Sequence, residues 1–74
     1  MNNKNIYPKI WYSKNKEKLS CKEKILLLNN NIMELHELAN DIYDEAILMG
    51  VNKEQIKEVL VNTIKNINSK LKSV

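Results

Sequence analysis

The ten residues "ILMGVNKEQI", residues 47–56, contain the only glycine of a 74-residue chain. Apolar residues precede Gly50, which stands where a helix C-terminus favours the left-handed backbone region that glycine enters without steric cost. Asn52, with Gln55 three residues later, is typical of the N-cap of a following helix. One helix therefore ends and another begins within three residues, which predicts two antiparallel helices joined at Gly50.

The first helix is predicted to span about 21–49. Ser20 and Glu23 match a capping box, so we expect the helix to begin at about Cys21. Apolar residues then recur at alternating spacings of three and four, which is the pattern of a heptad seam. The seam residues are Ile25, Leu28, Ile32, Leu35, Ala39, Ile42, Ala46 and Met49, and they are flanked by Leu26, Met33, Leu38, Tyr43 and Ile47. So wide an apolar surface needs more than one neighbour.

Three consecutive asparagines, residues 29–31, interrupt the good helix formers of this segment. Asparagine prefers caps, so the helix either kinks here or continues. Because the heptad phase survives across the run, we expect one continuous helix. The second helix is predicted over about 53–72, with an apolar stripe of Ile56, Leu60, Ile64, Ile67, Leu71 and Val74. The expected fold class is all-α: a helical hairpin, residues 20–74, completed by self-association or by a partner.

Residues 1–19 show no sustained periodicity, and Pro8 disfavours a helix there, so we expect an extended aromatic and basic arm. Aromatic side chains on a polar arm have two explanations. They cover the protein's own helices, or they anchor a partner, because Trp and Tyr are favoured hot-spot residues. The candidate partner-binding residues, from the arm and the first helix, are Tyr7, Ile10, Trp11, Tyr12, Leu26, Met33 and Tyr43.

The net charge is +3, and all twelve basic residues are lysine. Residues 1–24 carry +5, residues 25–52 carry −5 without a single lysine, and residues 53–74 carry +3. This pattern suits partner selection by charge. The lysines beside Trp11 and Tyr12 also allow nucleic-acid binding by backbone contact and base stacking. The absence of arginine disfavours base-specific reading.

Composition narrows the class of protein further. No apolar run approaches the roughly 18 residues of a membrane span, and the first residues do not resemble a signal peptide, so we expect a cytoplasmic protein without membrane contact. Cys21 is the only cysteine, which rules out a disulfide within the chain. We find no Gly-rich phosphate loop, zinc signature or nucleophile motif, and therefore predict no catalytic, cofactor or metal site.

Two short segments resemble enzyme families. "ELHELANDIYDEAILMGVN", residues 34–52, is similar to the second metal-binding helix of the all-α NTP pyrophosphatases. That resemblance implies divalent-metal nucleotide hydrolysis with Glu34 and Glu37 as ligands, although Glu37 replaces the family's Asp and the upstream E-x-x-E is missing. The helical hairpin also resembles the small phosphatases of aspartyl-phosphate relays, but "VLVNTIKNI", residues 59–67, lacks their acidic motif.

The sequence therefore favours a small non-enzymatic interaction module, acting as an adaptor, regulator or inhibitor, and forming a homodimer or docking on a protein partner. Short lysine- and asparagine-rich chains of this kind are common among phage and mobile-element proteins. A nucleic-acid-binding accessory protein is the first alternative. A divalent-metal nucleotide hydrolase with an incomplete site, based on Glu34 and Glu37, is the second.

Overall fold

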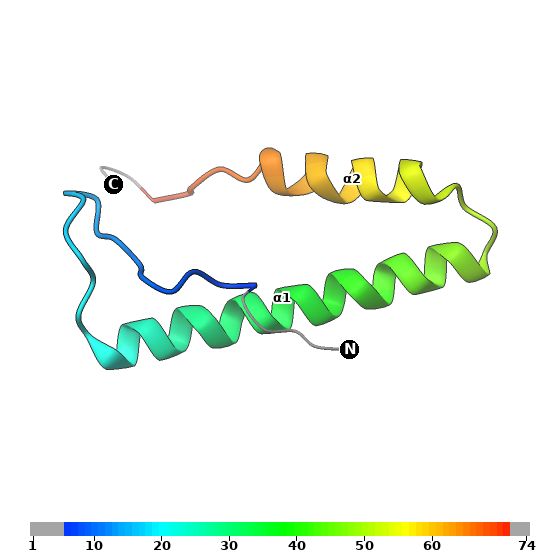
Figure 1. The fold of residues 1–74 in the computed structure, drawn as a ribbon. Coiled ribbons are helices and arrows are strands. Elements are labelled where there is room, and N and C mark those ends of the chain that lie inside the picture. Colours follow the sequence, from blue (N-terminus) through cyan, green and yellow to red (C-terminus); the bar gives the residue numbers. More distant parts are fainter. Residues whose placement is uncertain (1–5, 72–74) are drawn as a thin grey trace. The chain divides into compact units, whose positions relative to one another are not determined.

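A computed structural model describes residues 6–71 and contains two helices, α1 (Lys22–Leu48) and α2 (Lys53–Lys65) (Figure 1). The chain divides into two compact units, residues 1–38 and residues 39–74. The described residues contain no strand, only an isolated antiparallel bridge between Tyr12 and Lys18. The predicted all-α helical hairpin is confirmed, and α1 begins and ends within one residue of the predicted bounds.

Helix α1 is continuous through Asn29–Asn31, as the unbroken heptad phase predicts. Its first intrahelical bond runs from the Ile25 N–H to the Cys21 carbonyl, at 3.0 Å. Because the N-cap residue is the one whose carbonyl accepts that first bond, Cys21 and not Ser20 occupies the cap. Upstream, the backbone N–H of Leu19 is already bonded to the Trp11 carbonyl, which holds the chain in the arm up to the last residues before the helix.

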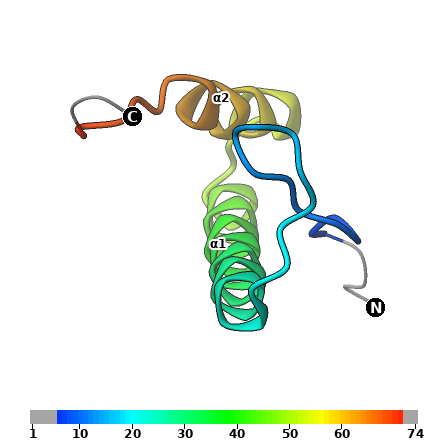
Figure 2. The ribbon, with the colours of Figure 1, turned by 90° about the vertical axis from the view of Figure 1, so that its left-hand side faces the viewer.

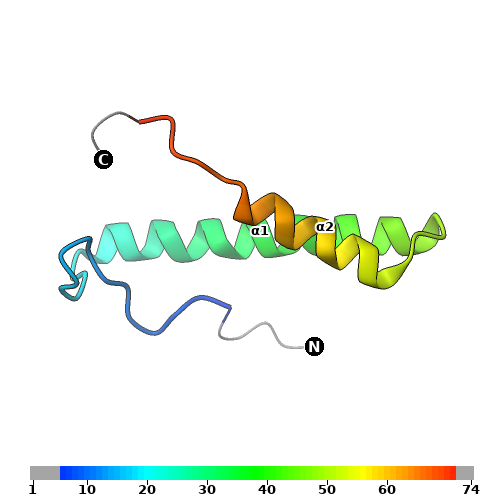
Figure 3. The same cartoon turned by 90° about the horizontal axis from the view of Figure 1, so that it is seen from above.

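The turn after α1 has the geometry predicted for Gly50. Its φ is +88°, in the region that favours glycine. The Gly50 N–H donates to the Ile47 carbonyl at 3.0 Å, and the Val51 N–H donates to the Ala46 carbonyl at 2.9 Å. These two bonds form a Schellman motif, which satisfies carbonyls that the helix end leaves free. The short connection returns the chain alongside the last turns of α1 (Figure 3).

Helix α2 begins at its predicted cap, where the Asn52 side chain accepts a 2.8 Å hydrogen bond from the Gln55 N–H. The predicted continuation to about residue 72 is wrong over the described part, because α2 ends at Lys65. Asn66 is the C-cap of α2: its backbone N–H donates to the Asn62 carbonyl at 3.1 Å, and its side-chain amide donates to the same carbonyl at 2.8 Å. Ile67 and Leu71 therefore lie in an irregular, exposed segment, and Val74 lies outside the described residues.

The second unit packs α2 against the C-terminal part of α1. Ala46 is the one buried residue in the described part of the chain, at 4% exposure. Its small side chain lets the two helices approach closely. The half-buried residues of the second unit are Ala39, Tyr43 and Ile47 on α1, Val51 in the turn, and Ile56 and Leu60 on α2. This core is thin, so its stability depends on a few contacts.

We expect Gly50→Ala to lower the free energy of unfolding by about 1 kcal/mol, because an alanine in the left-handed region is strained. A Cβ at this position would meet no atom within 4 Å, so the penalty comes from the backbone alone. Urea denaturation followed by circular dichroism measures it. Gly50→Asn is the matched control and should cost less, because asparagine tolerates this region better. Equal stability of the wild type and Gly50→Ala would contradict the assignment.

Candidate functional site

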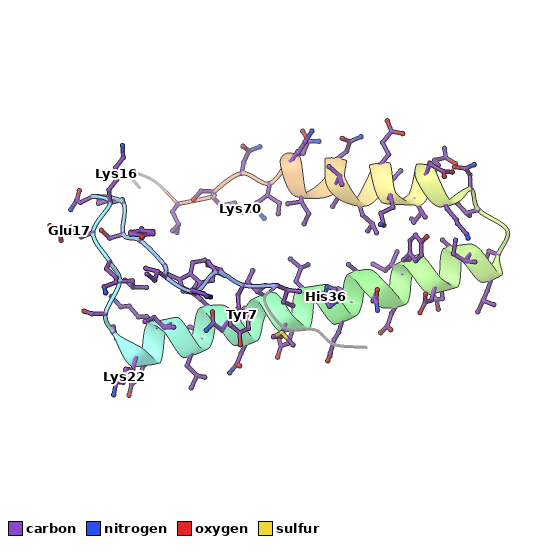
Figure 4. The ribbon with its side chains drawn as sticks, in the orientation of Figure 1. Tyr7, Lys16, Glu17, Lys22, His36 and Lys70 are labelled. Atoms are coloured by element: carbon purple, nitrogen blue, oxygen red, sulfur yellow. The ribbon has the colours of Figure 1, made fainter. Side chains whose placement is uncertain are left out.

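The arm of the first unit folds back on itself before α1 begins. The Ser13 N–H donates to the Glu17 carbonyl at 2.7 Å, and the Lys16 N–H donates to the Ser13 carbonyl at 2.9 Å. The Ser13 hydroxyl accepts from the N–H groups of Asn15 and Glu17. Lys16 has φ +68°, the only positive value among the described residues other than glycine. Serine thus closes a tight loop, residues 13–17, whose tip Figure 4 marks by Lys16 and Glu17.

Trp11 fastens the arm to α1. Its indole N–H donates a 2.7 Å hydrogen bond to the side-chain oxygen of Asn29, and the indole is half-buried. The Leu19 N–H donates to the Trp11 carbonyl at 2.8 Å, which joins the two segments that flank the loop. Asn29, a residue of low helix propensity, therefore serves as the hydrogen-bond acceptor that holds the arm. The arm runs beside the first half of α1, on one side of it (Figure 2).

The predicted partner-binding residues separate into two groups. Tyr7, Ile10, Tyr12 and Leu26 are exposed, with Tyr12 at 63% and Leu26 at 61%. All four belong to the first unit, and Figure 4 marks Tyr7 beside α1. The other group is half-buried and contributes to the fold of its own unit: Trp11 and Met33 in the first unit, Tyr43 in the second.

Tyr43 takes part in a small constellation within the second unit. The Lys57 ammonium lies 5.7 Å from the centre of the Tyr43 ring, within the range of a cation–π interaction. Tyr43, Lys53, Glu54 and Lys57 line an open hollow of about 360 Å³. Glu54 contributes a carboxylate to the same lining as the two lysines, and the Lys57 ammonium already lies over the Tyr43 ring. The hollow therefore does not concentrate one sign of charge.

Three lysines surround the loop of the arm. Lys14, Lys16 and Lys18 are all exposed, and so is the ring of Tyr12, whose backbone forms a bridge with that of Lys18. The sequence indicated the basic character of this segment but not the loop that presents it. The loop could have been predicted from Ser13 and Asn15, because serine and asparagine favour turns through side-chain hydrogen bonds to nearby backbone groups.

The acidic side chains of α1 are exposed and point to no metal centre. Glu34, Glu37, Asp41, Asp44 and Glu45 all lie on the surface. Among residues 6–71, no group of three or more His, Cys, Asp or Glu side chains gathers closely enough to hold a metal ion. His36 is half-buried on the face of α1 that also carries Asn29, and Cys21 is exposed at the helix start.

Comparison with known proteins finds no matching family model, no significantly similar curated protein and no significantly similar solved structure. In the described part of the chain, neither helix is both long enough and apolar enough to cross a membrane.

Proposed function

We propose that this chain is a small non-enzymatic protein-interaction module whose N-terminal arm binds a protein partner. The observation that carries the proposal is the combination of the Trp11–Asn29 hydrogen bond with the exposure of the apolar and aromatic side chains around it. Tyr7, Ile10 and Tyr12 stand on the arm, and Leu26 stands on the helix to which the arm is fastened. We name these four side chains the arm surface.

Because Trp11 holds the arm in place, the arm surface can bind a partner with higher affinity than a free arm could. A free, unstructured arm loses conformational entropy when it binds, whereas an arm that is already held in place loses less. Tyrosine brings a large contact area with few rotatable bonds, which is why it is common at binding hot spots. Such a surface suits an adaptor, a regulator or an inhibitor that blocks another protein's site. Because the first 24 residues carry +5, an acidic partner surface would associate fastest.

The test compares partner capture by the wild-type chain and by the double variant Ile10→Ser/Tyr12→Ser, each immobilised in extract from the source organism. We expect the wild type to retain a defined protein that the variant loses, with binding at least tenfold weaker once the protein is purified. Circular dichroism first verifies that the variant keeps its helices.

The matched control is Val59→Ser/Val61→Ser, which removes two apolar side chains of comparable exposure from α2 in the second unit. It should capture the same protein as the wild type. Equal capture by the arm variant, or equal loss with both variants, would contradict binding through the arm.

Nucleic-acid binding is the second candidate, and the exposed loop lysines are the observation that favours it. Lys14, Lys16 and Lys18 are exposed and close to Tyr12 in the sequence, and the exposed Tyr12 ring can stack on a base. Trp11 is less suited to stacking, because its ring is half-buried and its N–H is bonded to Asn29.

The two candidates differ in salt dependence. If the loop binds single-stranded nucleic acid, replacing its three lysines by alanine should reduce the slope of log affinity against log salt by about 2. Replacing Lys53, Lys57 and Lys65 of α2 by alanine removes the same charge elsewhere and should leave the slope less affected. No binding of an oligonucleotide at about 50 mM salt would remove this candidate.

A further inference from the structure

Helix α1 carries a second apolar face that remains exposed. Leu35, Leu38 and Ile42 follow heptad spacing, and Leu38 is 58% exposed. Leu27 extends the face toward the helix start, and Met49 extends it just past the helix end. We name these five residues the α1 stripe. It covers 22 residue steps, roughly 33 Å at 1.5 Å per residue.

Within the first unit, the stripe residues Leu27, Leu35 and Leu38 lie on the opposite side of α1 from the residue that holds the arm. Successive helical residues are about 100° apart, so Asn31, which lies on the same side of α1 as the stripe residues, is about 200° around the helix from Asn29. Asn29 is the residue that holds Trp11. A partner on the stripe therefore does not compete with the arm surface, and this inference goes beyond the proposed function.

The charges at the two ends of the stripe are opposite. Lys24 lies on the stripe side of α1 near its start, and Glu45 lies on that side near its end, both exposed. Residues 25–52 contain five acidic residues and no lysine, so the negative charge of this part of the chain is not balanced within the segment. An apolar face with a positive start and a negative end complements a copy of itself that runs in the opposite direction.

We propose that the α1 stripe binds a second copy of this chain, with the two α1 helices antiparallel. Full overlap of two helices spanning 22–48 is centred on Leu35. That register brings Leu35 of the two copies together and places Lys24 of each copy within about one residue of the second copy's Glu45. The contact is isologous, so both opposite-charge pairs form at once.

A parallel arrangement is disfavoured by the same charges. It would place each Glu45 beside the second copy's Glu45 and each Lys24 beside the second copy's Lys24, and like charges in contact destabilise a pair. Asn31 adds a polar position to the stripe, and a single polar residue in an apolar seam restricts register at some cost in stability. The antiparallel arrangement separates the acidic halves of the two helices.

The first test measures the molecular mass of the full chain in solution by sedimentation equilibrium. We expect a dimer for the wild type and a monomer for Leu38→Lys. Leu26→Lys is the matched control, because Leu26 has similar exposure but lies 120° around the helix from Leu38, and it should remain dimeric. A wild-type monomer up to several hundred micromolar, or a dimer that survives Leu38→Lys, would overturn the proposal.

A second test addresses the direction of the two helices and uses two exposed residues, Lys24 and Glu45. Lys24→Glu and Glu45→Lys should each weaken the dimer about two- to thirtyfold, since each removes two symmetric surface pairs. The double reversal Lys24→Glu/Glu45→Lys should restore most of the loss. Additive weakening in the double variant would overturn the antiparallel arrangement. Partner capture by the arm is scored separately, so a dimer without a partner and a partner without a dimer are distinguishable.

Discussion

Replacing Ala46 by aspartate should unfold the second unit. Ala46 is 4% exposed between α1 and α2, and a carboxylate there is taken out of water without a partner. Leaving a buried charge unpaired costs about 3–5 kcal/mol. At about 0.05–0.15 kcal/mol per residue, the 36 residues of the second unit supply about 2–5 kcal/mol, so the unit loses most or all of its stability. The measurement is the loss of helical circular dichroism and of cooperative thermal unfolding.

Leu48→Asp is the matched control for Ala46→Asp. It introduces the same charge two residues later on the same helix, but Leu48 is 87% exposed. The unfavourable interaction of an acidic side chain with the helix C-terminus is shared by both variants and is worth about 0.3–1 kcal/mol. We expect Leu48→Asp to remain folded. Similar losses in both variants would show that Ala46 is not the buried contact of the hairpin.

Replacing Trp11 by alanine should release the arm while α1 and α2 remain. The change removes the hydrogen bond to Asn29 and the packing of a half-buried indole, a loss of about 2–3 kcal/mol for the first unit. The readout is amide hydrogen exchange of Leu19, whose N–H is bonded to the Trp11 carbonyl. We expect that exchange to accelerate at least tenfold, because local opening becomes easier.

Trp11→Phe separates the hydrogen bond from the ring. Phenylalanine keeps an aromatic ring for packing but has no N–H to donate, so the expected loss is only about 1 kcal/mol. Exchange of Leu19 should then lie between the wild type and Trp11→Ala. Unchanged exchange in Trp11→Ala would mean that the arm is held by other contacts.

The hairpin could be predicted from local sequence because a different residue type marks each end of the turn. Gly50 supplies the left-handed residue and Asn52 supplies the cap, and both act within a few residues. The end of α2 was harder, since Ile64, Ile67 and Leu71 continue a helical spacing in the sequence. The asparagines between them favour bonds to their own backbone, and Ile67 and Leu71 are too exposed for packing to hold the helix together.

The packing of the arm on α1 could not be predicted from the sequence. Its aromatic residues suggested either packing on the chain's own helix or a partner anchor, and the structure divides them between the two: Trp11 packs and Tyr12 is exposed. The deciding contact joins residues eighteen positions apart, Trp11 and Asn29. No periodicity links such a pair, so Asn29 is visible in the sequence only as a poor helix former.

The most direct measurement of the proposed function places a photo-crosslinking phenylalanine derivative at Tyr12 in the chain, expressed in its source organism. Tyr12 is the most exposed aromatic residue of the arm surface. The same derivative at Lys65, on α2, is the control. We predict that irradiation produces one defined adduct with another protein from position 12 and not from position 65. Adducts with the chain's own second copy alone, or the same adducts from both positions, would contradict the claim that the arm binds a protein partner.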